Sequence, residues 1–218
     1  MDLKPTVNFL KDLSTNNNKE WFDTNRKTYE ACRKEFLAFV GNIIEELAKF
    51  DPELTGVDPK KCVFRINRDI RFSKDKTPYK TNFGALMGAN GKKTEGTGFY
   101  MHLAPGQNFA GGGIYMPPPE TLAAIRQEID YNPEGLKKLL ASKDFKNTFV
   151  DIKGDKLKTA PKGYPKDHPN IELLRLKSFY VIKEFSNKEL TSEGFFEDLI
   201  STYKKAHEFN KYLKEAIS

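Results

Sequence analysis

The feature that most constrains the fold is a change in the spacing of apolar residues near residue 60. From Trp21 to Phe50, apolar side chains recur at steps of three, four or seven, which is the spacing of a helix's buried side. Asp51-Pro52 ends this pattern, because a residue before proline disfavours the helical conformation. From Val63 to Phe72, apolar residues then alternate with polar ones, as in a half-buried strand. This change of period predicts a fold that combines helices with a sheet.

The middle of the chain predicts an antiparallel meander with short connections. Strands are predicted over residues 63–72, 81–87, 98–103, 109–116, 151–159 and 178–184. Helices are predicted up to residue 13 and over residues 17–50, 117–129, 135–149, 171–176 and 193–217. We therefore expect a single α+β domain spanning residues 1–218. Its mostly antiparallel mixed sheet is flanked by a long N-terminal helix and C-terminal helices.

The composition excludes several classes of protein. The chain has 27 aromatic residues among 218, which excludes an intrinsically disordered chain. No apolar run approaches the roughly 18 residues of a membrane-spanning helix, and the first residues lack the apolar stretch of a signal peptide. Two cysteines are too few for a disulfide framework, and the three histidines lack metal-ligand spacing. We expect a cytoplasmic protein without a membrane partner or a metal site.

The positive charge of the chain is confined to one segment. Residues 60–80 contain eight basic residues and two acidic ones, so this segment carries the whole net charge of +6. A local positive field of this kind attracts an anion or a polyanion. The other 197 residues are neutral in sum, which favours a local anion site over a long track for a polyanion.

Strand spacing would place several polar residues of this segment on one face. In the predicted strand 63–72 that face holds Arg65, Asn67, Asp69 and Arg71. Lys74, Lys76 and Lys80 follow in a loop that contains Pro78. Arginine and lysine are the side chains that hold phosphate or carboxylate groups. The alternative is a solvated strand face with internal Arg–Asp pairs.

Arg68 falls among the apolar positions of the predicted strand. A charge on a buried face is costly unless it is paired. We expect a structural pair with a carboxylate of the long helix, Glu20 or Asp23 being the candidates. The alternative is a sheet exposed on both faces, with Arg68 as a site residue.

Further residues are candidates for the same site. Tyr100 and His102 share the polar face of the predicted strand 98–103, and His102 is the best candidate for a general base. Gly111-Gly112-Gly113 indicates a bulge or a close approach of another group, which includes a ligand. Cys62 is expected to be a buried, inert thiol rather than a reactive one. Trp21 is expected to be an aromatic anchor, with a role in lining the pocket as the alternative.

Several motifs together resemble a known family, the domain of unknown function 2461. The most distinctive runs from Arg65 through Arg71-Phe72-Ser73-Lys74 to Thr81. The others are Asn17-Asn18-Lys19-Glu20-Trp21-Phe22, Gly111-Gly112-Gly113 with Tyr115 and Pro117, Pro161-Lys162-Gly163-Tyr164, and Asp167-His168-Pro169. The resemblance covers nearly the whole chain. It implies a soluble bacterial or fungal protein without an assigned activity. It also implies that the basic segment and the Pro161–Tyr164 loop belong to one site.

The sequence favours binding of a phosphorylated or otherwise anionic small molecule. The predicted ligand-binding residues are Arg65, Arg68, Asp69, Arg71, Lys74, Lys76, Tyr79, Lys80, His102 and Gly112. The alternatives are an enzyme acting on a phosphorylated small molecule, with Asp69 or His102 as its acid or base, and a nucleic-acid-binding protein. A partner-binding module is a further alternative, which requires an exposed apolar patch. The sequence identifies no cofactor and no catalytic residue.

Overall fold

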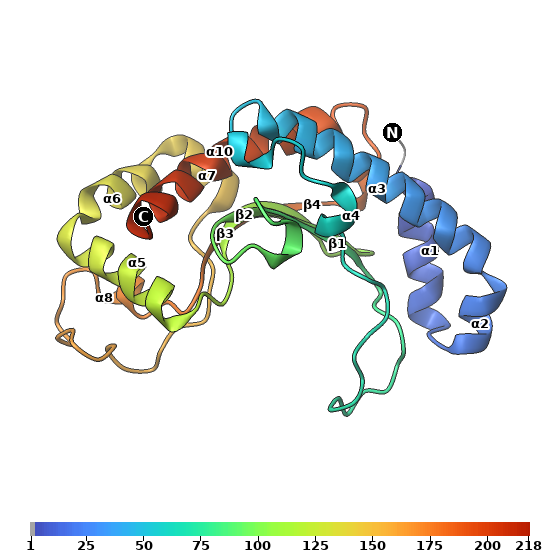
Figure 1. Ribbon diagram of the computed structural model, residues 1–218, viewed down its shortest axis with the longest axis horizontal. Coiled ribbons are helices and arrows are strands. Elements are labelled where there is room, and N and C mark those ends of the chain that lie inside the picture. Colours follow the sequence, from blue (N-terminus) through green and yellow to red (C-terminus); the bar gives the residue numbers. More distant parts are fainter. Residues whose placement is uncertain (1–2) are drawn as a thin grey trace. The chain divides into compact units, whose positions relative to one another are not determined.

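The computed structural model describes residues 3–218 and shows an α+β fold with a four-stranded antiparallel sheet (Figure 1). The strands are β1 (Phe83–Met87), β2 (Gly98–Leu103), β3 (Asn108–Ile114) and β4 (Phe179–Phe185), and they neighbour one another in that order. The helices before the sheet are α1 (Lys4–Thr15), α2 (Lys19–Thr24), α3 (Arg26–Ala48), the 3-10 helix η1 (Pro52–Leu54) and α4 (Pro59–Cys62). The later ones are the 3-10 helix η2 (Gly91–Lys93), α5 (Pro119–Tyr131), α6 (Pro133–Ala141), α7 (Lys143–Phe149), α8 (Ile171–Leu174), α9 (Asn187–Leu190) and α10 (Phe195–Ala216). The predicted α+β class is confirmed.

The chain divides into two compact units. Unit 1 comprises Met1–Lys93, Tyr100–Ala110 and Glu184–Ile200, and unit 2 comprises Thr94–Phe99, Gly111–Lys183 and Ser201–Ser218. The chain passes from one unit to the other within strands β2, β3 and β4. The single domain expected over residues 1–218 stays a prediction.

The core of unit 1 forms between helix α3 and the elements that contact it. Helix α3 contacts α1 and strand β1. The ring of Phe36 lies 5.3 Å from that of Phe83 in β1, and Phe39 stacks on Phe195 at 6.1 Å. These side chains are almost fully buried, as the helical spacing of residues 21–50 predicted for Phe36.

Unit 2 has a second aromatic core around α10. The ring of Phe99 lies 5.5 Å from Tyr203 and 6.2 Å from His207, so His207 belongs to this packing. Phe145 of α7 contacts Phe209 of α10 at 6.5 Å. None of the helices within residues 3–218 combines the length and the apolar character that a membrane crossing needs.

The two faces of β2 follow the predicted alternation. Phe99, Met101 and Leu103 are buried, whereas Tyr100 and His102 are only partly covered. Side chains of successive strand residues point to opposite faces, so the three buried residues face the core. Tyr100 and His102 therefore share the opposite face, as predicted.

The predicted helix over residues 17–50 is divided at Asn25. Helix α2 ends at Thr24 and α3 begins at Arg26. The Asn25 side chain donates a hydrogen bond to the carbonyl oxygen of Trp21 at 2.9 Å. The same oxygen accepts from the Asn25 backbone N–H at 3.0 Å. Asn25 has φ −97 and ψ 11, outside the α-helical range, and this conformation separates the two helices.

The predicted strand over residues 151–159 is wrong. The segment makes two isolated bridges, Lys153 with Tyr180 and Lys156 with Leu176. Between them Gly154 has φ +149, and a Cβ there would lie 2.4 Å from the carbonyl oxygen of Ser178. This glycine lets the segment run close beside its neighbour but interrupts regular pairing.

Candidate functional site

The basic residues lie on an irregular excursion of unit 1, not on a strand. This basic extension, residues 64–82, connects α4 to β1 and protrudes from unit 1 (Figure 1). Its two arms pair through Arg68 N–H donating to Pro78 O at 2.9 Å and Lys80 N–H donating to Ile66 O at 2.7 Å. Apart from the bridges of Val63 with Ala85 and Asn67 with Tyr79, residues 63–72 form no ladder. The predicted strand over residues 63–72 is therefore wrong.

A bulge separates the extension from the sheet. Phe64 N–H donates to Gly84 O at 3.0 Å, and the next pair joins Ile66 to Lys80. The paired positions are thus two residues apart on the first arm and four apart on the second, which leaves Thr81 and Asn82 as extra residues. Extra residues of this kind bend a paired segment and redirect its side chains.

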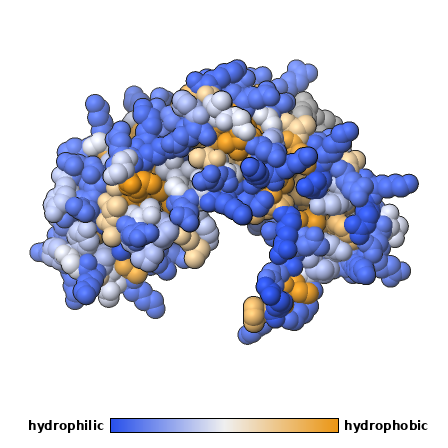
Figure 2. All heavy atoms as spheres, in the orientation of Figure 1, coloured by the Kyte–Doolittle hydropathy of each residue, from blue (hydrophilic) through white to orange (hydrophobic). Residues whose placement is uncertain are grey.

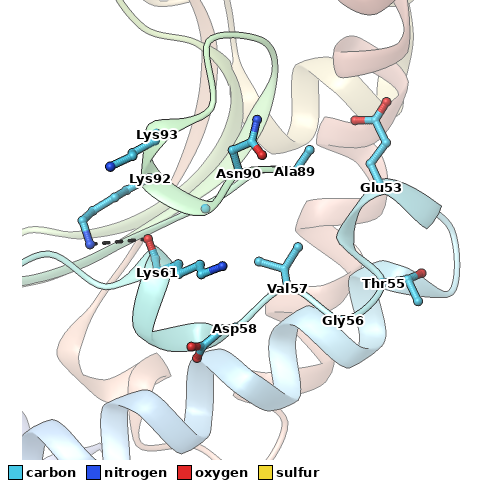
Figure 3. Close-up of a pocket in the computed structure, with 11 residues that line it drawn as sticks. Glu53, Thr55, Gly56, Val57, Asp58, Lys61, Ala89, Asn90, Lys92 and Lys93 are labelled. Carbon is cyan, nitrogen blue, oxygen red and sulfur yellow. Dashed lines mark hydrogen bonds between the residues drawn. The ribbon is translucent and has the colours of Figure 1, made fainter.

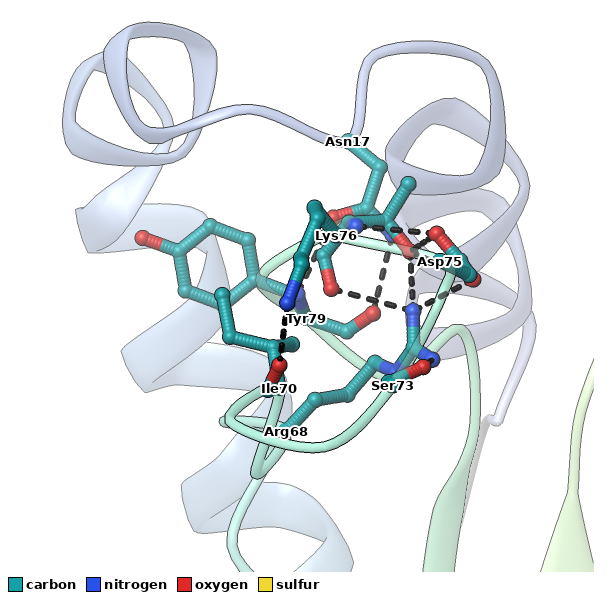
Figure 4. Close-up of polar contacts among 8 residues, drawn as sticks. Asn17, Arg68, Ile70, Ser73, Asp75, Lys76 and Tyr79 are labelled. Carbon is teal, nitrogen blue, oxygen red and sulfur yellow. Dashed lines mark hydrogen bonds and ion pairs between the residues drawn. The ribbon is translucent and has the colours of Figure 1, made fainter.

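Arg68 organises the outer part of the extension (Figure 4). One guanidinium nitrogen donates to Asp75 Oδ2 at 2.5 Å, to the Thr77 carbonyl oxygen at 3.0 Å and to the Thr77 hydroxyl. The other lies 3.4 Å from Ser73 Oγ. Hydrogen bonds from Thr77 and then Arg68 lower the pKa of the Asp75 carboxyl. Arg68 is thus paired, but within the extension and not with the predicted Glu20 or Asp23.

Two more predicted site cations are engaged locally. Arg71 holds Asp69 in a two-point ion pair, with nitrogen–oxygen distances of 2.9 and 2.7 Å. This pairing, assisted by the charge of Arg65, lowers the pKa of the Asp69 carboxyl. The Lys76 ammonium donates to the Ile70 carbonyl oxygen at 3.0 Å (Figure 4). Within residues 3–218, the side chains of Arg65, Lys74 and Lys80 make no hydrogen bond and no ion pair.

The end of the extension exposes one aromatic ring. Phe72 is 95% exposed, although the alternating pattern placed it on a buried face. The Arg71 guanidinium lies 5.9 Å from its ring centre. Figure 2 shows that the extension is mostly hydrophilic and carries hydrophobic residues at its end.

Where the extension joins the sheet, four rings of unit 1 form an aromatic cluster: Phe64, Tyr100, His102 and Phe109. His102 stacks on Phe109 with the planes 4° apart and the ring centres 4.7 Å apart. Tyr100 lies 5.8 Å from Phe109 and 6.4 Å from Phe64. All four side chains are partly exposed. The cluster is thus a ring-lined surface on the face of β2 opposite to the core.

Tyr100 and His102 are joined by a hydrogen bond of 3.1 Å between the phenol oxygen and Nδ1. Burial raises the pKa of Tyr100 to about 12, so the phenol keeps its proton at neutral pH. Burial also lowers the pKa of His102, which favours a neutral imidazole. A phenol that donates to Nδ1 leaves the proton of the ring on Nε2. Within residues 3–218, Nε2 has no hydrogen-bond partner.

Lys80 connects the basic extension to the aromatic cluster. Its ammonium lies 5.5 Å from the ring centre of Phe64, and its side chain is partly covered. Burial, and to a lesser extent the charge of Arg65, lower the pKa of Lys80. Among residues 3–218, the Lys80 side chain thus lies beside the ring-lined surface without an ion-pair partner, and the charge of Arg65 acts on it.

Tyr79 is part of the core and not of this surface. Its ring is 7% exposed and stacks on Phe22 at 3.9 Å with the planes 14° apart. The Asn17 side chain holds its backbone by accepting from Tyr79 N–H at 3.1 Å and donating to Tyr79 O at 2.9 Å (Figure 4). Tyr79, a predicted ligand-binding residue, therefore uses its ring in the core of unit 1. Asn18 caps α2 by accepting from Trp21 N–H.

The triple glycine serves the packing of unit 2. A Cβ on Gly111 would lie 1.7 Å from Val181 O in β4, and one on Gly113 would lie 2.2 Å from Phe179 O. On Gly112 it would lie 3.1 Å from the Asn210 side chain of α10. The close approach indicated by these glycines is therefore an approach of protein. Gly112, a predicted site residue, is buried against α10 and has no room there for a ligand.

His168 is held by bonds to both of its ring nitrogens in unit 2. Asn170 N–H donates to Nδ1 at 3.0 Å, so Nε2 carries the proton and donates to Asp130 Oδ1 at 2.9 Å. The Tyr164 ring lies 6.1 Å away. These bonds tie the Asp167–Pro169 motif to α5 and leave no free nitrogen for proton transfer. That this loop and the basic segment form one site stays a prediction.

A groove that the sequence did not indicate lies elsewhere in unit 1 (Figure 3). It has a volume of about 660 Å³ and is lined by Glu53, Thr55, Gly56, Val57, Asp58, Lys61, Ala89, Asn90, Gly91, Lys92 and Lys93. Lys92 of η2 donates to the carbonyl oxygens of Lys61 and Val63 at 3.4 and 3.3 Å, which joins η2 to the end of α4. The lining mixes both signs of charge, so no single charge pattern in the sequence marks it.

The structure bears on two kinds of reactive group, the Cys62 thiol and side chains that could bind a metal ion. Cys62 is fully buried, and burial raises the pKa of its thiol to about 11, so it is an inert thiol at neutral pH as predicted. Among residues 3–218, no three His, Cys, Asp or Glu side chains come together in a way that could hold a metal ion.

The family model described as Conserved hypothetical protein (DUF2461) matches residues 5–212. The chain belongs to the DUF2461 family. This confirms the resemblance drawn from the sequence motifs. No curated protein and no solved structure matches the chain. The matched range of this DUF2461 chain includes the whole basic extension, the aromatic cluster and the bonds around His168.

In this DUF2461 chain, Arg68→Met is expected to loosen the extension without unfolding the protein. The substitution removes the donors that Asp75, Thr77 and Ser73 share, at a cost of about 2 kcal/mol for a partly exposed group. That cost corresponds to an increase of roughly 30-fold in chymotryptic cleavage after Phe72, since cleavage follows local opening.

Arg71→Met is the matched control for this measurement. It also removes one arginine, but its ion pair with Asp69 is exposed and contributes about 0–1 kcal/mol. Equal cleavage rates in the two variants would show that Arg68 does not organise the extension.

Proposed function

We propose that the protein binds a phosphorylated or otherwise anionic small molecule at Arg65 and Lys80, beside the aromatic cluster. The observation that carries the proposal is the pair of like charges at this place. Burial, and then the charge of Arg65, lower the pKa of Lys80, and neither side chain makes an ion pair within residues 3–218. The one carboxylate within this range on which the Arg65 charge acts, Asp69, is already held by Arg71. Repulsion of this kind destabilises the protein unless an anion relieves it. A bound phosphate would accept from both side chains.

The proposed site contains fewer residues than the site predicted from the sequence. Arg68, Arg71 and Lys76 already have partners in the extension, and Tyr79 and Gly112 are buried. The Lys74 side chain has no such partner within residues 3–218, but it lies beyond Arg68 and Pro78, the outermost paired positions of the two arms. Of the ten predicted residues, Arg65, Lys80 and His102 support the proposal most directly.

An enzyme acting on a phosphorylated small molecule is a second candidate. The observation that favours it is His102, whose lowered pKa and unpartnered Nε2 suit a group that exchanges protons with a ligand. Conversion of a bound phosphorylated compound by the wild type, with loss of conversion in His102→Gln, would support this candidate over binding alone.

Lys80→Met is expected to weaken the binding of inorganic pyrophosphate by about 10- to 150-fold. This range corresponds to the roughly 1.5–3 kcal/mol of a hydrogen bond to a charged group. Methionine is a similarly long, unbranched side chain that lacks the charge, so the substitution removes the ammonium beside Phe64. Isothermal titration calorimetry of wild type and variant measures the change.

Lys74→Met is the control, because it removes the same charge from the same segment. It is expected to change the dissociation constant by less than about threefold. Pyrophosphate that binds wild type and Lys80→Met equally, or does not bind the wild type at all, would overturn the proposal.

A further inference from the structure

The aromatic cluster has the properties of a stacking surface. Its four rings are contiguous, with neighbouring ring centres 4.7 to 6.4 Å apart, and each remains partly exposed. The His102 ring already stacks in parallel on Phe109. A planar heterocycle from a ligand is favoured by the same kind of contact, since aromatic rings attract stacked bases.

The polar atoms at this surface suit the edge of a heterocycle. With the Tyr100 phenol donating to Nδ1, the His102 Nε2–H remains free to donate to a ring nitrogen or carbonyl oxygen. The Lys80 ammonium lies at the other end of the cluster, against Phe64. The surface therefore offers a cationic end and a ring-lined end with one directional donor.

We propose that the anion bound by Arg65 and Lys80 is the phosphate of a nucleotide whose base stacks on the aromatic cluster. This inference rests on the proposed function and adds the chemical class of the ligand. A sugar phosphate would place hydroxyl groups on rings that offer few polar partners. A nucleotide matches both ends, because its phosphate needs cations and its base needs a planar apolar surface.

Two sources supply this chemistry, a free nucleotide and a single-stranded nucleic acid. A longer strand has further bases and phosphates that reach beyond one site. The end of the extension, with exposed Phe72 and the unpartnered Lys74, offers such additional contacts. A free nucleotide would not need them. The two sources therefore differ in their dependence on Phe72.

The test compares adenosine 5′-monophosphate with ribose 5-phosphate, which has the same phosphate but no base. We expect the wild type to bind the nucleotide about 5- to 150-fold more tightly, the range for one stacked base. Phe109→Leu is expected to remove most of this preference and to leave the affinity for ribose 5-phosphate unchanged. Phe72→Leu, which removes a ring from the extension, is the matched control and should leave both affinities unchanged.

A decathymidylate identifies the source. Tighter binding of this oligonucleotide than of thymidine 5′-monophosphate, lost in Phe72→Leu, assigns the site to single-stranded nucleic acid; equal binding assigns it to free nucleotides. Equal wild-type affinities for adenosine 5′-monophosphate and ribose 5-phosphate overturn the inference and leave the proposed function standing. Binding of neither compound, nor of pyrophosphate, overturns both.

Discussion

Gly111→Ala is expected to lower the free energy of unfolding by at least about 4 kcal/mol. The added Cβ would lie 1.7 Å from the carbonyl oxygen of Val181 and 2.9 Å from the Ile182 Cα, both backbone atoms of β4. Neither atom belongs to a flexible side chain, so β3 and β4 must separate to admit the methyl group. Overpacking of the core is one of the few mechanisms that give losses above about 4 kcal/mol in a single substitution. The loss is a large part of the 5–15 kcal/mol that stabilises a typical protein.

Urea unfolding followed by circular dichroism measures this loss, and Gly106→Ala is the matched control. Gly106 has φ +77 and no heavy atom within 4 Å of an added Cβ. Alanine there meets only the backbone penalty of the left-handed region, about 1–2 kcal/mol. A Gly111→Ala protein as stable as Gly106→Ala would show that the strands are not in close contact at Gly111.

The sequence predicted the elements whose residues repeat regularly. Strand β2 runs from Gly98 to Leu103 as predicted, because its alternation holds over six residues. The helical spacing after residue 193 likewise predicted α10. In both elements local pattern and tertiary packing select the same faces, so the pattern is sufficient.

The alternation of apolar and polar residues over 63–72 predicted a strand wrongly. A strand needs a continuous ladder of backbone hydrogen bonds to a neighbour, and this segment has only isolated bridges. Asp69 and Asp75 find partners inside the extension, and the Asn17 side chain holds the Tyr79 backbone from a segment 62 residues away. These contacts favour a compact excursion over a continued ladder. The contact of Asn17 with Tyr79 depends on the position of the segment that leads into α2, which no local spacing encodes.

The sequence showed which segment carries the positive charge, but not which of its basic side chains are paired with carboxylates. Periodicity cannot show that Arg68 pairs with Asp75, since that ion pair needs the turn between them. It did place Tyr100 and His102 on one face of β2, since that depends on alternation alone. Alternation could not show that Phe64 and Phe109 contact these two rings. Phe64 comes from the basic extension and Phe109 from the neighbouring strand β3.

Phe22→Ala is expected to cost about 3–5 kcal/mol and to loosen the base of the extension. Phe22 is 3% exposed and lies at ring distances of 3.9 Å from Tyr79 and 5.0 Å from Tyr29. Truncation of a buried phenylalanine to alanine leaves a cavity, and losses in this range are typical. Because Tyr79 loses its stacking partner, the neighbouring bonds of Lys80 N–H and Arg68 N–H should open more often.

Hydrogen exchange of these two amides, read together with chemical unfolding, separates the local effect from the global one. Trp21→Ala is the control, since Trp21 is only partly buried and contacts Phe9 at 5.9 Å. We expect this substitution to cost about 1–2 kcal/mol, because it removes the buried part of one aromatic side chain, and to leave both amides as protected as in the wild type.

If Trp21→Ala exposes the Lys80 amide as strongly as Phe22→Ala does, the extension is held by the whole α2 segment and not by the Phe22–Tyr79 stack. Protection that is unchanged in Phe22→Ala would instead leave the two hydrogen bonds of Asn17 as the contact that fixes Lys80 beside the aromatic cluster.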